Sequence, residues 1–268
     1  MVKAIFFDLD DTLLWDKKSV ALAFAKTCKL AGEISGKDCS GLEEAVRNEA
    51  SELYAGYATY PYTKMIGINP FEGLWGTFDD EGDDFQQMKA LISDYQRDAW
   101  KRGLKKIGID DPALGRKLAA YFPEARKQSP VLYEESLEIL DQLKGRYQLL
   151  LLTNGSPSLQ NTKLEITPEI VPYFDHIVIS GAFGRGKPDP AIFQHALSKF
   201  GLQPDDALMV GDNLLTDIIG AEKAGIRSVW INREAKVPHE TIIPTYEIKH
   251  LQELLPILEA MKKAEKLS

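Results

Sequence analysis

Three aspartates lie within four positions near the start of the chain, directly after a short apolar run. Asp8, Asp10 and Asp11 follow residues 4–7, which are rich in Ile and Phe. Burying an isolated carboxylate is costly, so we expect a buried strand to end here. A carboxylate can act as a nucleophile, as a general acid or base, or as a ligand for a hard cation. The cluster therefore predicts a reactive site at the strand's carboxyl end.

Three further polar segments follow later apolar runs in chain order. They contain Thr153, Asn154 and Gly155; then Lys187; then Asp212 and Asn213, with Asp217 four residues beyond Asn213. Together with Asp8 they can supply what phosphoryl transfer requires. The carboxylates of Asp8 and Asp212 suit Mg²⁺, which separates a carboxylate nucleophile from a negatively charged phosphate. Lys187 adds a fixed positive charge, and the 153–155 segment offers a hydroxyl and amides for phosphate oxygens.

These residues must be positioned by strands that alternate with helices. Apolar runs at 4–7, 147–153, 176–180, 207–211 and 227–231 predict buried strands, and 246–248 predicts a short last one. Helical spacing or capping signals predict helices at 19–32, 41–54, 85–104, 112–122, 134–143, 190–200, 214–224 and 251–261. Residues 54–84, which carry four tyrosines and an acidic cluster, are interpreted as a long irregular connection.

The alternation predicts an α/β fold with a Rossmann-like parallel sheet and helices on both faces. An all-helical stretch interrupts this pattern after the first strand. We therefore expect a catalytic core at 1–15 and 129–268, and an inserted α-helical cap domain at 16–128. Because the insertion follows the carboxylates, we expect it to cover the site, exclude bulk water and select the substrate.

Bulk composition narrows the classes of partner. The 268-residue chain has a formal net charge of −8, which argues against nucleic acid or an anionic membrane as its main partner. Its two cysteines, Cys28 and Cys39, suggest reduced thiols rather than a disulfide framework or a zinc site. The chain begins directly with a strand and lacks an apolar run long enough to cross a membrane. These features predict a cytoplasmic protein.

The four segments resemble the motifs of the haloacid dehalogenase superfamily, in the branch with a helical cap inserted after the first strand. The matching residues run from Asp8 to Thr12 and include Thr153-Asn154-Gly155, Lys187, and Gly211-Asp212-Asn213 with Asp217. The resemblance covers roughly 1–15 and 130–250. The cap matches only in position and helical character.

The resemblance implies a role for each matched residue. Asp8 would attack phosphorus, and Asp10 would protonate the leaving alcohol and then deprotonate water. Mg²⁺ would be bound by Asp8, Asp212 and the Asp10 carbonyl. The phosphoryl group would be held by the 153–155 segment and by Lys187, which would also neutralise Asp8. Thr12, Asn213 and Asp217 would support these residues. Thr12 would make a positioning hydrogen bond, and Asp217 would orient metal-bound water or Lys187.

We therefore expect a Mg²⁺-dependent phosphatase acting on a small phosphomonoester such as phosphoserine, phosphoglycolate or a sugar phosphate. A phosphomutase of the same superfamily is an alternative. A 2-haloacid dehalogenase is another, disfavoured by Asp10 and Asp212 because halide displacement needs neither a leaving-group acid nor a metal. A catalytically silent ligand- or partner-binding protein is the alternative outside enzymes. The expected state is a monomer or homodimer, and Trp15 is a candidate for the substrate pocket.

Overall fold

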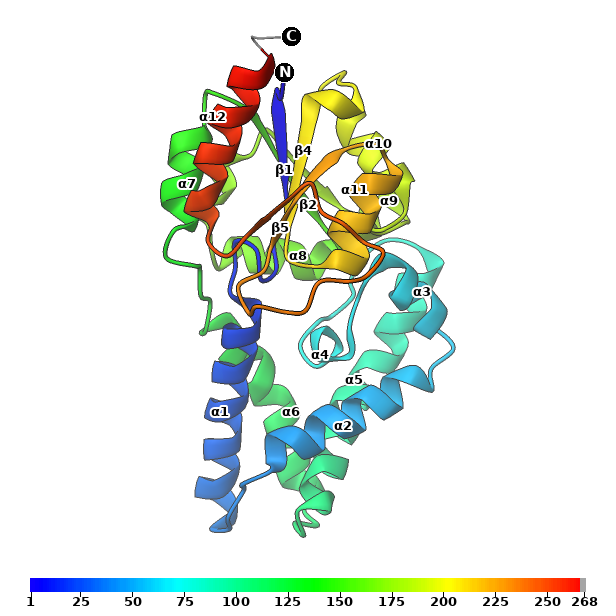
Figure 1. Ribbon diagram of the computed structural model, residues 1–268. Helices are drawn as coiled ribbons and strands as arrows, with labels where there is room; N and C mark the ends of the chain where they lie inside the picture. The colour runs from blue at the N-terminus through cyan, green and yellow to red at the C-terminus, as the bar shows by residue number, and fades with distance from the viewer. Residues whose placement is uncertain (266–268) are drawn as a thin grey trace. The chain divides into compact units, whose positions relative to one another are not determined.

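The computed structural model describes residues 1–265 and contains a parallel β-sheet (Figure 1). Six strands in this range pair in the order β3-β2-β1-β4-β5-β6, and every neighbouring pair is parallel. Their bounds are β1 Ala4–Phe7, β2 Gln148–Thr153, β3 His176–Ile179, β4 Ala207–Gly211, β5 Arg227–Ile231 and β6 Tyr246–Ile248. The predicted α/β class is confirmed, including the short last strand.

The order of the strands creates a switch point beside β1. From β1 the chain continues to β2 and β3 on one side, whereas β4, β5 and β6 extend the sheet on the other. Phe7 pairs with Leu151 of β2 and with Val210 of β4, and the Asp8 amide donates to the Val210 carbonyl at 2.9 Å. In open α/β sheets ligands bind where the strand order reverses, outside the carboxyl ends of the strands. Asp8 lies at that position.

Helices cover both faces of this sheet. On one face, Ala4 and Phe6 share an apolar cluster with side chains of α10 (Pro190–Ser198) and α11 (Ile219–Lys223). In Figure 1, α7 (Ser136–Leu143) and α12 (Leu254–Glu265) lie on the opposite side of the strands. All four β1 residues are buried, as expected for a strand enclosed on both faces.

The chain divides into two compact units. Among the described residues, the first comprises 1–15, 132–155 and 167–265, and contains the sheet; the second comprises 16–131 and 156–166. The sequence-based division had placed 129–131 and 156–166 in the core. The second unit consists of α1 Asp16–Ser35, α2 Leu42–Ala55, α3 Tyr60–Ile66, α4 Pro70–Gly73, α5 Asp83–Lys106, α6 Pro112–Lys127 and α8 Pro157–Glu165. Among residues 1–265, no helix combines the length and apolar character that a membrane crossing requires.

The prediction of one long irregular connection at 54–84 was wrong, because α3 and α4 lie within it. The start of α4 is fixed by a capping box: Asn69 Oδ1 accepts from the Phe71 and Glu72 amides, and the Glu72 carboxylate accepts from the Asn69 amide. Such reciprocal capping stabilises even a helix of one turn. The tyrosines of this region pack partly on helix α5, where the Tyr54 and Tyr95 rings lie 5.5 Å apart.

Other helices were either not predicted from the sequence or have a different form from the one predicted. Helix α8 was not predicted from the sequence, although Ser156 as N-cap and Pro157 at its first position signal a helix start. The predicted helix 214–224 begins as a π-helical turn, Leu214–Ile218, before α11. The remaining short elements are α9 Ser180–Phe183 and the 3-10 turns Val171–Tyr173, Pro204–Asp206 and Leu251–Glu253.

Candidate active site

Lys187 lies at the centre of a buried charged cluster at the carboxyl ends of the strands. Its Nζ lies 2.6 Å from Asp8 Oδ1 and 2.6 Å from Asp217 Oδ1, and donates to the Leu152 carbonyl at 2.7 Å. These three contacts match the three donors of an ammonium group. Burial would lower the pKa of Lys187, but the charges of Asp217 and Asp8 raise it above its ordinary value. The side chain is therefore a fixed cation.

The backbone of Lys187 is fixed by Asn154, which follows β2. Asn154 Oδ1 accepts from the Lys187 amide at 2.8 Å, and Asn154 Nδ2 donates to the Lys187 carbonyl at 2.9 Å. This two-way contact joins segments that follow β2 and β3. Thr153 is buried at the end of β2, and the Gly155 amide donates to Ser180 Oγ at 2.8 Å. The structure thus brings the 153–155 segment and Lys187 together.

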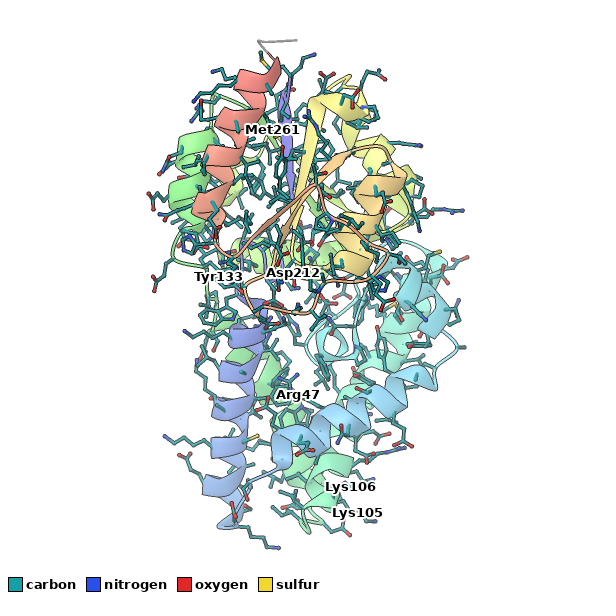
Figure 2. The ribbon with its side chains drawn as sticks, viewed as in Figure 1. Arg47, Lys105, Lys106, Tyr133, Asp212 and Met261 are labelled. Atoms are coloured by element: carbon teal, nitrogen blue, oxygen red, sulfur yellow. The ribbon has the colours of Figure 1, made fainter. Side chains whose placement is uncertain are left out.

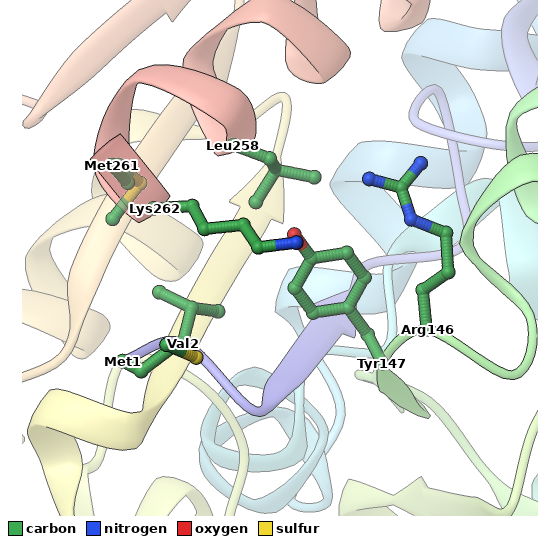
Figure 3. A pocket seen from close by; sticks show the side chains of 7 residues that line it. All are labelled: Met1, Val2, Arg146, Tyr147, Leu258, Met261 and Lys262. Carbon is green, nitrogen blue, oxygen red and sulfur yellow. The ribbon is translucent and has the colours of Figure 1, made fainter. Parts of the chain in front are cut away.

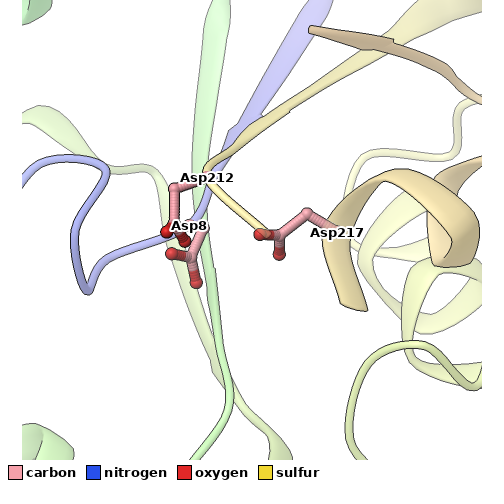
Figure 4. Close-up of side chains that lie close together, drawn as sticks. All are labelled: Asp8, Asp212 and Asp217. Carbon is pink, nitrogen blue, oxygen red and sulfur yellow. The ribbon is translucent and has the colours of Figure 1, made fainter. Parts of the chain in front are cut away.

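Three carboxylates form the acidic part of the cluster (Figure 4). Asp8, Asp212 and Asp217 each offer one oxygen, and these oxygens lie within 4.8 Å of one another. The Asp217 carboxylate also accepts from the Asn213 amide at 3.1 Å, and Asn213 Oδ1 accepts from the Leu215 amide. Gly211 permits this arrangement, because a Cβ there would lie 2.3 Å from Asp217 Cγ.

Burial and the neighbouring carboxylates raise the pKa of Asp8 and of Asp212. Burial is the largest cause for Asp8, whose pKa rises to about 6 even though Lys187 opposes the change. Burial and the charges of Asp8 and Asp217 raise the pKa of Asp212 to about 8. A hard divalent cation would relieve this repulsion, and carboxylate oxygens are the ligands it prefers. The donor set therefore fits Mg²⁺.

The turn that follows Asp8 contains the remaining predicted residues. Thr12 Oγ1 donates to Asp8 Oδ2 at 3.2 Å. Asp10 is half-buried and forms a backbone bridge with Leu14, and its carboxylate is not part of the three-aspartate group. Trp15, which is 37% exposed, stacks on Tyr133 with ring centroids 5.3 Å apart. The structure thus brings Thr12 onto Asp8 and Trp15 onto another aromatic ring.

The chain is similar to known proteins over nearly its whole length. A family model described as haloacid dehalogenase-like hydrolase matches residues 2–225. The chain belongs to the haloacid dehalogenase-like hydrolases. It is 33% identical to a phosphoserine phosphatase of Thermus thermophilus, over 94% of this chain and 98% of that protein. It is 39% identical to a glyceraldehyde 3-phosphate phosphatase of Pyrococcus abyssi, over 97% and 94% of the two chains.

A solved structure extends this likeness to three dimensions. The 2-haloacid dehalogenase from Pseudomonas syringae pv. Tomato DC3000 matches with a TM-score of 0.61 and 25% identity, covering 97% of this chain and 100% of that one. The haloacid dehalogenase-like family therefore accounts for the fold as well as the motif order. Its members are named for different activities, so the substrate must be argued from the site.

In this haloacid dehalogenase-like hydrolase, two cations near the carboxylates were not predicted from the sequence. Arg233 donates to the Thr12 carbonyl at 3.1 Å and pairs with Glu135. Lys236 Nζ lies 3.6 Å from Asp212 Oδ2. Both follow β5, whose carboxyl end lies on the same edge of the sheet as Asp8. That position was the available signal, because polar residues after any strand of a parallel sheet reach this edge.

Of two pockets in the sheet-containing unit, one is lined by a carboxylate of the cluster and the other is not. Asp212, which is labelled in Figure 2, lines one of about 620 Å³ together with Trp230, Lys236 and residues 237–241. Figure 3 shows another, of about 150 Å³, lined by Met1, Val2, Arg146, Tyr147, Leu258, Met261 and Lys262. The second pocket lies by the amino ends of β1 and β2 and contains none of the motif residues.

Proposed function

We propose that this hydrolase is a Mg²⁺-dependent phosphatase that cleaves small phosphomonoesters through an aspartyl-phosphate on Asp8. One observation supports this most strongly. The buried Asp8 carboxylate contacts a fixed cation, Lys187, at 2.6 Å and shares its surroundings with Asp212 and Asp217. A nucleophilic carboxylate, a lysine and a cation-binding acidic group are the parts that phosphoryl transfer requires.

The proposed reaction has two steps. An oxygen of Asp8 attacks phosphorus, the bond from phosphorus to the ester oxygen breaks, and Asp10 gives its proton to the departing alcohol. Asp10 then takes a proton from water as the water oxygen attacks phosphorus, which releases phosphate and restores the Asp8 carboxylate. Lys187 and the 153–155 segment hold the phosphoryl oxygens, and Thr12 keeps Asp8 oriented through its hydroxyl.

Mg²⁺ would be held by the carboxylates of Asp8 and Asp212 and by the Asp10 carbonyl, with Asp217 supporting the arrangement. When bound, it supplies positive charge that offsets the repulsion between the phosphate and the carboxylate nucleophile. Asp217 already engages Lys187 at 2.6 Å and the Asn213 amide at 3.1 Å. Its proposed role is therefore to orient Lys187 rather than to contact the substrate.

The similar proteins favour a small phosphorylated metabolite as substrate. Two relatives above 30% identity are named for phosphatase activity on phosphoserine and on glyceraldehyde 3-phosphate. We propose phosphoserine, phosphoglycolate and sugar phosphates as the compounds to try first. Trp15, exposed beside Tyr133, is a proposed wall of the substrate pocket. A cytoplasmic location and a monomeric or homodimeric state stay predictions.

The likeness to a dehalogenase favours a second candidate, 2-haloacid dehalogenation. Two features of this chain argue against it. Asp10 supplies an acid for an alkoxide leaving group, which a halide does not need, and Asp212 gives the site a second metal-binding carboxylate. A phosphomutase would keep both residues but return the phosphoryl group to a sugar.

One panel of assays separates these reactions. The purified chain is incubated with Mg²⁺ and small phosphomonoesters, and with 2-chloropropionate in parallel. We expect phosphate release from a few esters and no chloride release. Chloride release would identify a dehalogenase. Isomerised sugar phosphate without free phosphate would identify a mutase, and no product from any compound would favour a silent binding protein.

A further inference from the structure

The segment that carries Asp10 is a tight turn, residues 10–14, which only Leu9 separates from Asp8. The Leu13 and Leu14 amides both donate to the Leu9 carbonyl, at 3.0 and 2.9 Å, and the Asp11 amide donates to the Leu14 carbonyl at 2.6 Å. Asp11 has a φ of 61°, in the left-handed region. Asp10 is the first residue of this turn, so its position depends on how the turn is held.

Hydrogen bonds from outside the turn hold its far side. The Leu13 carbonyl accepts from the Tyr133 amide at 3.1 Å and from Ser136 Oγ at 2.8 Å. The Thr12 carbonyl accepts from Arg233 Nη2 at 3.1 Å. Of these three donors, Arg233 contacts the residue that also donates to Asp8. A side chain after β5 is thereby linked to the nucleophile through one residue.

Arg233 is itself held on three sides. Its Nη1 lies 2.5 Å from Glu135 Oε1, and its guanidinium carbon lies 3.6 Å from the centre of the Tyr133 ring, which is labelled in Figure 2. Glu135 is 5% exposed and also accepts from the Leu251 amide. A planar guanidinium with donors in a fixed fork can stack on a ring and bridge two oxygens at once, whereas a lysine cannot.

We propose that Arg233 is a positioning residue that holds the 10–14 turn so that the Asp10 carboxyl can protonate the leaving group. This inference rests on the proposed function. Arg233 contacts the Thr12 carbonyl, Glu135 and Tyr133, and acts on the reaction only through the turn. Small displacements of a catalytic group lower a rate strongly, because proton transfer depends on distance and alignment.

The test compares two substrates with different needs for acid. An alkyl phosphate, such as glycerol phosphate, must have its departing oxygen protonated, whereas p-nitrophenyl phosphate releases a stabilised anion. For Arg233→Met we expect kcat on the alkyl ester to fall by about tenfold or more relative to kcat on p-nitrophenyl phosphate. Asp10→Asn should shift the same ratio further. Because both substrates are measured on one preparation, the ratio is unaffected by the fraction of folded enzyme.

Arg227→Met is the matched control, since Arg227 begins β5, the strand that Arg233 follows, and donates to the Asp205 carbonyl at the opposite end of the sheet. It should leave the ratio unchanged. If Arg233→Met does not fold, Arg233→Lys replaces it, and we expect an intermediate shift in the same direction. Equal losses of kcat on both substrates, or no loss, would overturn the positioning role of Arg233. Mg²⁺-dependent hydrolysis by the wild type would in that case still support the proposed function. A wild type that releases phosphate from no ester of the panel, these two included, would overturn both.

Discussion

Asp10 and Asp8 differ in what each is expected to contribute to the rate. In the proposed reaction Asp8 forms the covalent intermediate, whereas Asp10 transfers protons. We predict that Asp10→Asn lowers kcat on an alkyl phosphomonoester by about 10²- to 10⁴-fold, the usual range for losing a general acid or base. Steady-state kinetics at saturating substrate and Mg²⁺ would measure this. An unchanged kcat would mean that another group transfers the proton.

Gly211 leaves room for the Asp217 side chain of the charged cluster because it has no Cβ. A Cβ there would lie 2.3 Å from Asp217 Cγ and 2.4 Å from one of its carboxylate oxygens. We predict that Gly211→Ala displaces Asp217, loosens Lys187 and destabilises the protein by about 1–3 kcal/mol, as overpacking does. Thermal unfolding and phosphate release would measure the two effects. Full activity with unchanged stability would show that the cluster adjusts freely.

At the scale of helices, the second unit depends on a close crossing of α2 and α5. A Cβ on Gly103 of α5 would lie 2.4 Å from Val46 Cγ2 of α2. Gly103→Ala gains about 1 kcal/mol of helix propensity but overpacks this contact, at a cost of about 1–3 kcal/mol. We predict net destabilisation, measured as the free energy of unfolding in urea.

Gly32 provides the matched control for that crossing. It lies inside α1, where an added Cβ would meet only the Lys37 carbonyl oxygen at 3.5 Å, an ordinary contact. Gly32→Ala should therefore gain stability by up to about 1 kcal/mol. If both alanines change the free energy of unfolding equally, the crossing does not require a glycine.

A buried ion pair joins the first and last long helices of the second unit. Arg126 Nη2 of α6 lies 2.7 Å from Asp16 Oδ1 of α1, and the arginine side chain is 2% exposed. Burial alone would raise the pKa of Asp16, but the charges of Lys163 and Arg126 outweigh it and lower that pKa. The stabilisation is present above the unfolded pKa of about 3.9 and is lost as pH falls through the lower, folded value.

We therefore predict that Asp16→Asn lowers the free energy of unfolding by about 3 kcal/mol at pH 6, because it leaves Arg126 buried without a carboxylate. The difference from the wild type should shrink as the pH falls below about 4. Urea unfolding at a series of pH values would measure it. A difference that persists unchanged at pH 2.5 would show that the charge of Asp16 is not the cause.

Strands and long helices were predictable from the sequence, whereas short helices were not. Runs such as 149–152 are apolar throughout and flanked by turn residues, so a buried strand explains them well. By contrast, α4 and α8 depend on caps at Asn69 and Ser156, and a cap becomes convincing only with a clear periodic pattern after it. The π-helical start of Leu214–Ile218 carries no distinct sequence signal.

For the molecule as a whole, the convergence of the motif residues was predictable because each lies at or after the carboxyl end of a strand. Parallel strands bring their carboxyl ends to one edge, so Asp8, Lys187 and Asp212 converge although they are far apart in sequence. Pairs that depend on side-chain length, such as Arg233 with the Thr12 carbonyl, could not be derived this way. The boundaries of the two units also could not be predicted from the hydrophobic pattern, because residues 156–166 belong to the second unit although they are far from 16–131 in sequence.

The most direct test of the central claim is phosphate release by the wild type and by Asp8→Asn, each with Mg²⁺ and with a chelator. Asp8→Asn keeps the shape of the side chain and removes the nucleophile, and circular dichroism would verify folding. We predict release only by the wild type with Mg²⁺. Release by Asp8→Asn at the wild-type rate, or wild-type release that persists fully in chelator, would contradict the proposed phosphatase.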